Sequence, residues 1–171
     1  MIIFLCGFMG SGKTTLMKTL QASTMIGSEI NFVDLDQTII ESAGKFDSVD
    51  NFVSVLGWDH FRSRERELIF EYCKKGEEQN YIVSLGGGAL SEGGLAIIKQ
   101  NSNAKLLWVD TEFDVCYQRI KNDSNRPLVK KGGDFLRELY NSRCEHYKQA
   151  DFVFGENEQN EIIFLEQVFK N

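Results

Sequence analysis

The chain has 171 residues, a length typical of one domain, and 42% of them are hydrophobic, which is enough for a sizeable core. The net charge is −6 at pH 7, so we expect no nucleic-acid partner and no membrane partner. No apolar run approaches the roughly 20 residues of a transmembrane helix, and the N-terminus lacks the pattern of a signal peptide. The four cysteines are far apart and form no C-x-x-C pair, which predicts reduced thiols and a cytoplasmic protein.

The first 20 residues combine a strand, a glycine-rich turn and a helix. Residues 2–6 form a continuous apolar run, which is typical of a parallel strand buried on both faces. Residues 7–14 (GFMGSGKT) fit the pattern G-x-x-x-x-G-K-[ST], and Leu16, Met17 and Leu20 follow at helical spacing. A plain glycine turn with an incidental lysine is the alternative, but the flanking strand and helix favour a phosphate-binding loop.

The chemistry of this loop predicts binding of a nucleoside triphosphate with Mg²⁺. A helix N-terminus presents unpartnered N–H groups and a positive partial charge, and both attract phosphate. Gly10 and Gly12 carry no side chains, so the backbone can curl around a phosphate chain. Lys13 would reach the outer phosphates, and the Thr14 hydroxyl would ligate the metal ion.

Residues 29–76 are predicted to contain one strand and several helices. The predicted elements are a strand at 29–33 and helices at 37–43, 48–56 and 59–75. The short helix at 48–56 should end at Gly57 and the long helix at Gly76. The long helix is amphipathic, and its expected buried stripe is Phe61, Leu68, Ile69 and Tyr72.

The remaining chain continues the alternation of strands and helices. We expect strands at 81–85, 104–109 and 152–154, and helices at 91–100, from 111, at 134–149 and at 161–169. A capping box should begin the helix at Thr111, and Asp134 should cap the next one. Ile162, Leu165 and Phe169 should face inward on the last helix. This alternation predicts an α/β fold, a parallel sheet with helices on both faces, in which the functional site lies at the carboxyl ends of the strands.

That rule selects two further groups of residues. Asp34 and Asp36 follow the second strand, and Gly86–Gly88 follow the third. One carboxylate could serve the metal and the other a second substrate, although both could instead cap the following helix. Three successive glycines suggest that another group must approach the backbone closely.

Two arginines have the helical phase of apolar stripes. Arg143 lies between Tyr140 and Tyr147 on one stripe, and Arg62 lies beside Phe61 at the edge of another. Buried arginines must be paired or must line a cavity, and their forked geometry suits a carboxylate. The pair therefore suggests an anionic second substrate, with structural salt bridges to Glu65 or Glu145 as the alternative.

The segment at 122–133 has no periodicity and is polar, so it is predicted to be an exposed, mobile loop. It carries Arg126, which could close over a triphosphate and stabilise charge in the transition state. A solvated surface loop is the alternative.

These segments occur in the same order as in the shikimate kinase family, which the chain resembles over nearly its whole length. The matching pieces are GFMGSGKTT (7–15), DLD (34–36), FR (61–62), LGGG (85–88), RPL (126–128), Arg143 with Tyr147, and AD (150–151). The resemblance implies a three-layer α/β/α P-loop kinase with a five-stranded parallel sheet. It also implies a single domain over 1–171, with a mobile lid at about 122–134 and a substrate-binding segment at about 34–62.

The resemblance also implies an activity, the transfer of the γ-phosphoryl group of Mg-ATP to the 3-hydroxyl of shikimate. Catalysis would depend on Lys13, Asp36 and Arg126. ATP would be bound by Gly10, Ser11, Gly12, Lys13, Thr14, Thr15, Arg119 and Arg126, with Arg119 against the adenine. Shikimate would be bound by Asp36, Arg62, Gly86, Gly87, Gly88 and Arg143. Thr14 would ligate Mg²⁺, and Asp34 would do so through water.

Other classes of protein remain to be weighed. A related small-molecule kinase, such as a gluconokinase-like enzyme, is the nearest alternative, but the arginine pair with the glycine triplet favours shikimate. A GTPase switch should carry an N-K-x-D motif, which does not occur in the sequence. A silent nucleotide-binding regulator should lack Asp36 or Arg126, and both are present. We expect the chain to act as a monomer.

Overall fold

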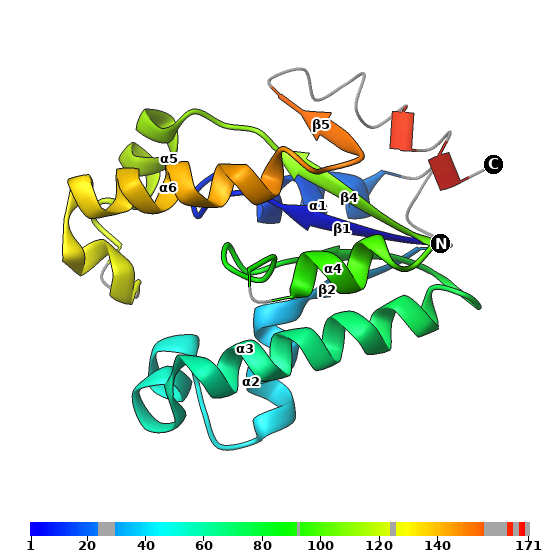
Figure 1. Cartoon of the computed structure of the whole chain (residues 1–171), viewed down its shortest axis with the longest axis horizontal. Coiled ribbons are helices and arrows are strands. Elements are labelled where there is room, and N and C mark those ends of the chain that lie inside the picture. Colours follow the sequence, from blue (N-terminus) through cyan, green and yellow to red (C-terminus); the bar gives the residue numbers. More distant parts are fainter. Residues whose placement is uncertain (24–29, 92, 124–125, 156–163, 166–167, 170–171) are drawn as a thin grey trace.

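The computed structural model describes residues 1–23, 30–91, 93–123, 126–155, 164–165 and 168–169, and a parallel sheet of five strands forms its centre (Figure 1). The strands are β1 (Ile2–Cys6), β2 (Ile30–Asp34), β3 (Asn80–Ser84), β4 (Ala104–Val109) and β5 (Phe152–Phe154). Their order in the sheet is β2-β3-β1-β4-β5, and every neighbouring pair is parallel. This all-parallel sheet of five strands confirms the predicted α/β fold. The strand that leads into the phosphate loop, β1, lies in the middle of the sheet.

Helices cover both faces of this sheet, which gives three layers (Figure 1). The helices are α1 (Lys13–Ala22), α2 (Leu35–Ala43), α3 (Val49–Lys75), α4 (Gly94–Lys99), α5 (Phe113–Ile120) and α6 (Gly133–Tyr147). Ile2, Phe4 and Cys6 of β1 face the core with α3, α4 and α6, whereas Ile3 and Leu5 face α1. Both faces of β1 are fully buried, as its continuous apolar sequence predicts.

The predicted break in the long helical region is confirmed at Gly57. There α3 has a non-helical backbone, with φ 84° and ψ 164°, so two helical pieces meet at a kink. The predicted stripe after the kink is buried: Phe61, Leu68, Ile69 and Tyr72 are at most 8% exposed.

The start of α2 differs from the prediction. The helix begins at Leu35 rather than at residue 37, because the Asp34 side chain caps it by accepting a hydrogen bond of 3.1 Å from the Gln37 N–H. The capping alternative therefore holds for Asp34. Asp36 lies in the first helical turn, not at the strand end, and its side chain is left available for the site.

Two other predicted caps are wrong. No side chain caps α5, because the Thr111 hydroxyl donates instead to the Ser11 carbonyl oxygen at 2.9 Å. No side chain caps α6 either, because the helix begins at Gly133 and Asp134 lies in its first turn. The helix predicted at 91–100 is shorter and spans Gly94–Lys99, since Gly93 has a left-handed backbone with φ 99°.

The segment predicted as an aperiodic loop contains a short 3₁₀ helix, η1 (Pro127–Lys131), which brings Leu128 and Val129 against the core. Residues 124–125 of that segment lie outside the described residues. So do residue 29 and most of the helix predicted at 161–169, including Ile162. Leu165 is fully buried, as predicted for an inward position.

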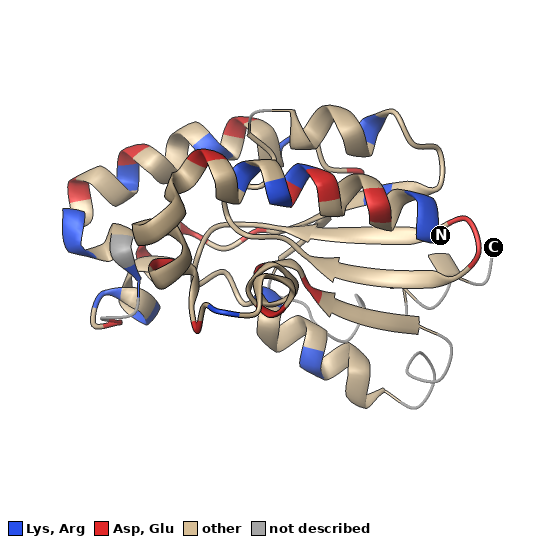
Figure 2. Cartoon of the chain, turned by 90° about the horizontal axis from the view of Figure 1, so that it is seen from below, with Lys and Arg blue, Asp and Glu red and all other residues tan. Residues whose placement is uncertain are grey.

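Charged residues of both signs are interspersed along the helices, and the strands carry few of them (Figure 2). The four cysteines are buried and unpaired, in agreement with the predicted thiols. Among the described residues, the helices are all too short or too polar to cross a membrane.

Candidate functional site

Two neighbouring cavities open where the strands end. The larger, of about 1280 Å³, surrounds the phosphate loop, and the smaller, of about 290 Å³, lies between α3, α6 and the glycine triplet after β3. The residues that line both cavities are Met9, Asp36, Val49, Gly86, Gly87 and Arg126. A group bound in one cavity can therefore meet a group bound in the other across this shared wall.

The phosphate loop has the backbone shape that its glycines predict. Gly10 and Gly12 have φ values of 82° and 100°, and a side chain on Gly10 would lie 2.7 Å from the Cys116 carbonyl oxygen. Lys13 Nζ donates to the carbonyl oxygens of Gly7 and Phe8, at 2.8 and 3.0 Å. Burial lowers the pKa of Lys13 to about 8, although nearby acidic groups oppose the shift.

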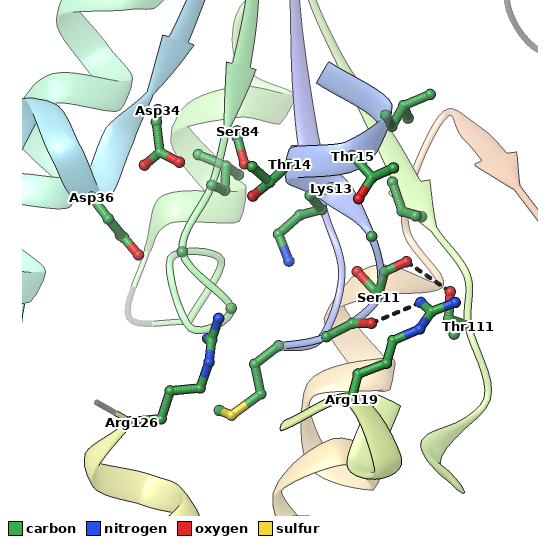
Figure 3. Close-up of a pocket in the computed structure, with 18 of the residues that line it drawn as sticks. Ser11, Lys13, Thr14, Thr15, Asp34, Asp36, Ser84, Thr111, Arg119 and Arg126 are labelled. Atoms are coloured by element: carbon green, nitrogen blue, oxygen red, sulfur yellow. Dashed lines mark hydrogen bonds between the residues drawn. The ribbon is translucent and has the colours of Figure 1, made fainter. Parts of the chain in front are cut away.

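Two side chains hold the outer edge of this loop (Figure 3). Thr111 donates to Ser11 as described above, and Arg119 Nη1 donates to the Gly10 carbonyl oxygen at 2.9 Å. Both lie in the lining of the larger cavity. Arg119, predicted to contact the adenine, therefore also fixes the backbone of the phosphate loop.

Asp36 lies between the two cavities, and its carboxylate points toward the space in front of Lys13 (Figure 3). Burial and the neighbouring Asp34 raise the pKa of Asp36 to about 6, against the attraction of Lys13 and Arg62. One of its oxygens is buried and has no hydrogen-bond partner in the described structure. Such an oxygen is suited to accept a hydrogen bond from a bound hydroxyl group.

Asp34, Ser84 and Thr14 form an oxygen-rich edge of the larger cavity (Figure 3). Asp34 and Ser84 are partners in the register of β2 and β3, so their side chains leave neighbouring strand ends. Thr14 comes from the first turn of α1. Ser84 was not among the predicted site residues, and its position directly before Leu85 and the glycine triplet is the signal that could have revealed it.

Arg62 lines the smaller cavity and forms an ion pair with Glu65, so the predicted alternative of a structural salt bridge also holds. The Arg62 and Glu65 side chains are only 13% and 1% exposed. Burial raises the pKa of Glu65 to about 7, and the adjacent Arg62 limits that rise. The second Glu65 oxygen is buried without a hydrogen-bond partner in the described structure.

Arg143 also lines the smaller cavity, but its surroundings differ. Within the described part of the chain no carboxylate lies at ion-pair distance from it, and the predicted candidate Glu145 pairs with Lys148 at 2.7 Å. Its guanidinium lies over the Phe8 ring, 5.7 Å from the ring centroid. Burial lowers the pKa of Arg143, and the neighbouring Tyr147 and Glu65 oppose the shift.

The glycine triplet makes room for these four charged groups. A side chain on Gly86 would lie 2.5 Å from Asp36 Oδ1 and 2.8 Å from Glu65 Oε1. On Gly88 it would lie 2.5 Å from Arg62 Nη2, and on Gly87 it would lie 3.0 Å from Arg143 Nη1. The three glycines were predicted to let another group come close to the backbone. The groups that do so are side chains of this same site.

The turn is also held by Tyr147, whose hydroxyl donates to the Gly87 carbonyl oxygen at 2.6 Å.

Arg126 lines both cavities and forms an ion pair of 2.8 Å with Asp123. With Arg126, all the residues predicted for the site lie around the two cavities.

Comparison with known proteins identifies relatives over nearly the whole chain. Residues 9–171 match the family model described as shikimate kinase. A shikimate kinase of Persephonella marina is 36% identical over 149 residues, which cover 87% of this chain and 85% of the relative. A shikimate kinase of Staphylococcus epidermidis is 33% identical over 160 residues, which cover 92% of this chain and 87% of the relative.

Solved structures agree with these sequence matches. The shikimate kinase from Acinetobacter baumannii in complex with shikimate has a TM-score of 0.80 at 26% identity, covering 99% of this chain and 92% of that one. The shikimate kinase from Aquifex aeolicus has a TM-score of 0.77 at 28% identity, covering 99% of this chain and 98% of that one.

Proposed function

The chain belongs to the shikimate kinase family, and from this premise we propose how its residues transfer the γ-phosphoryl group of ATP to the 3-hydroxyl of shikimate. The observation that carries the proposal is the shared wall of the two cavities, to which Asp36 and Arg126 belong. Phosphoryl transfer requires mainly that donor and acceptor be positioned and that charge be stabilised. A nucleotide in the larger cavity and shikimate in the smaller one would meet at these two residues.

Shikimate is a small cyclic anion with several hydroxyl groups, and the smaller cavity offers matching partners. We assign its carboxylate to Arg62 and Arg143, whose forked donors converge beside Gly88. The backbone of Gly86, Gly87 and Gly88 lines the same cavity and lies against the ring. A bound carboxylate would give Arg143 the ion-pair partner that it lacks among the described residues.

Asp36 is placed to hold the hydroxyl that attacks the phosphorus. Its unpartnered oxygen accepts the hydroxyl proton in a hydrogen bond, and the carboxylate either orients the nucleophile or removes its proton. A pKa of about 6 keeps the group mostly ionised at neutral pH and leaves it basic enough for this task.

The nucleotide is bound by the phosphate loop and two arginines. The phosphates replace the carbonyl oxygens of Gly7 and Phe8 as partners of Lys13, and the N-terminus of α1, which begins at Lys13, faces the phosphate chain. Arg119 packs against the adenine beside the loop. Arg126 and Lys13 stabilise the transferring phosphoryl group.

The donor set at the edge of the larger cavity fits Mg²⁺, which prefers oxygen ligands. Thr14 would ligate the ion directly and Asp34 through water, with the Ser84 hydroxyl close by. No group of three or more His, Cys, Asp or Glu side chains suited to a metal occurs in the described residues. A Mg²⁺ ion held by these residues would supply positive charge that offsets the negative charge of the phosphates.

The remaining proposals concern the chain as a unit. One domain over 1–171 contains the full set of site residues, so a monomer suffices for activity. Residues 122–134 act as a lid that carries Arg126 and Leu128 over the smaller cavity and excludes water from the reaction. The use of ATP and the four unpaired cysteines favour the cytoplasm as the place of action.

The direct test offers shikimate, gluconate and nucleoside monophosphates in parallel with Mg-ATP and measures the release of ADP. We expect release that depends on shikimate, with shikimate 3-phosphate identified by phosphorus NMR. Release with gluconate or a nucleotide and not with shikimate would contradict the proposal, while leaving the fold unchanged.

A further inference from the structure

Trp58 is part of the wall of the smaller cavity although it was not among the predicted site residues. It follows Gly57, whose non-helical backbone interrupts α3, so it is the first residue of the helical piece after the kink. The residue is 37% exposed, so it borders both the cavity and solvent.

The indole of Trp58 contacts two residues one helical turn further along α3. The guanidinium carbon of Arg62 lies over the indole, 5.0 Å from the ring centroid. Phe61 meets the same indole edge-on, with 5.9 Å between the ring centroids. Arg62 is thus held between an aromatic face and its ion-pair partner Glu65.

We propose that Trp58 determines the affinity for shikimate, by holding and shielding Arg62 and by providing an aromatic wall for the substrate ring. This inference rests on the proposed function, because it concerns the carboxylate that Arg62 is assigned to bind. Trp58 is a positioning residue with respect to Arg62.

The geometry explains why an aromatic partner suits this position. The donors of a guanidinium lie in its plane, so an aromatic ring over its face leaves those donors free. One of them pairs with Glu65, and Arg62 Nη2 remains directed at the turn by Gly88. The indole also keeps water from the cation on its exposed side, which strengthens the attraction between Arg62 and a bound carboxylate.

The test compares the steady-state kinetics of Trp58→Ala, Trp58→Leu and Trp58→Phe with those of the wild type. Trp58→Ala loses the cation–π contact with Arg62, and its KM for shikimate should therefore rise about 5- to 30-fold. Trp58→Leu keeps apolar bulk without a ring, so its KM should also rise. Trp58→Phe should restore the KM to within about threefold of the wild type. In all three variants kcat and the KM for ATP should stay within about twofold.

Phe70→Ala is the matched control. Phe70 is another exposed aromatic side chain of α3, with Lys74 Nζ over its ring at 4.4 Å, and it lines neither cavity. Its loss should leave the KM for shikimate unchanged, and thermal unfolding should show that this variant and Trp58→Ala remain folded.

A spectroscopic measurement tests the contact itself. Trp108, the other tryptophan, lies on β4 and lines neither cavity, so Trp108→Phe leaves the emission of Trp58 alone. Addition of shikimate without nucleotide should change this emission, and Arg62→Ala should abolish the change. An unchanged emission would contradict the proposal.

A wild-type KM for shikimate in Trp58→Ala or in Trp58→Leu would overturn the role of the indole. These outcomes require a wild type that phosphorylates shikimate. If the wild type releases no ADP with shikimate, it is the proposed function that fails.

Discussion

Arg62 and Arg143 lie in the same cavity but differ in what their removal leaves behind. Arg62 compensates the buried carboxylate of Glu65, whereas within the described residues Arg143 has no carboxylate at ion-pair distance. Removing one partner of a buried ion pair is costly, because the other charge remains without compensation. Removing Arg143 leaves no buried carboxylate of the described chain without its ion-pair partner, so it should not destabilise the fold in this way.

We therefore expect Arg62→Ala and Arg143→Ala to have similar effects on binding and different effects on stability. Each should raise the Kd for shikimate by about 10- to 100-fold, because a charge-assisted hydrogen bond is lost. Only Arg62→Ala should lower the free energy of unfolding, by about 1–3 kcal/mol. Isothermal titration calorimetry and urea unfolding measure the two quantities.

Arg64→Ala is the control for this pair of variants, since Arg64 forms an exposed ion pair with Glu67 on the same helix. It should change neither quantity by more than about 0.5 kcal/mol. Unchanged shikimate affinity in both Arg62→Ala and Arg143→Ala would show that the two arginines are structural.

The buried carboxylates should make activity depend on pH. Burial raises the pKa values of Asp36 and Glu65 to about 6 and about 7. Both groups must be ionised, one to accept the hydroxyl hydrogen bond and the other to hold Arg62. The kcat/KM for shikimate should therefore fall as the pH drops from 8 to 5, with an apparent pKa between about 6 and 7 that belongs to the coupled pair.

Glu65→Gln separates the two ionisations. This variant has no carboxyl group at position 65 to ionise, so the fall in kcat/KM at low pH should report Asp36 alone, with an apparent pKa of about 6. Its kcat/KM should be lower at every pH, because Arg62 has lost its charged partner. A wild-type profile that stays flat down to pH 5 would contradict the assignment of both carboxylates.

At the scale of elements, the turn after β3 is shaped by the side chains that fold over it. A methyl group on Gly88 would meet the mobile end of Arg62, at 2.5 Å from Nη2, whereas one on Gly94 would overlap the carbonyl oxygen of Ala89 in the backbone. A side chain can change its rotamer to relieve such a clash, whereas moving a backbone turn costs more free energy. The two glycines are therefore needed for different reasons.

Gly88→Ala should displace Arg62 and raise the KM for shikimate by about 10-fold, with little change in the midpoint of unfolding. Gly94→Ala should leave that KM unchanged and destabilise the fold by about 1–3 kcal/mol. Kinetics and thermal unfolding of both variants check the contrast. A Gly88→Ala variant with wild-type KM would show that the turn can relax without moving Arg62.

The predictions from sequence succeeded where local pattern decides the structure. The strand, loop and helix of residues 2–20 follow from an apolar run, a glycine pattern and helical spacing, and the structure has all three. The caps predicted at Thr111 and Asp134 were wrong. Thr111 binds a partner 100 residues away in the chain, and no local pattern in the sequence indicates that contact. Asp134 lies inside α6, which begins one residue earlier.

At the scale of the whole molecule, the parallel sheet brings together residues from every part of the chain. Strand order could not be read from the sequence, yet the rule that sites lie at the carboxyl ends of parallel strands sufficed to select Asp36 and the glycine triplet. The pairing of Arg62 with Glu65 was left as an alternative, and the structure shows both the pair and the cavity. Ser84 could have been found from its place directly before Leu85 and the glycine triplet. The contact of the Trp58 indole with Arg62 required the structure.

The central claim is that Asp36 serves both cavities, holding the hydroxyl of shikimate in line with the transferring phosphoryl group. The most direct test measures shikimate-dependent release of ADP by Asp36→Asn at saturating substrates, beside shikimate binding by calorimetry. Asp59→Asn, which changes an exposed carboxylate outside both cavities, is the control.

We predict that kcat of Asp36→Asn falls by about 100-fold or more, while shikimate still binds within about 10-fold of the wild-type affinity. A kcat within about threefold of the wild type would contradict the claim, since Asp36 would then neither orient the hydroxyl nor accept its proton.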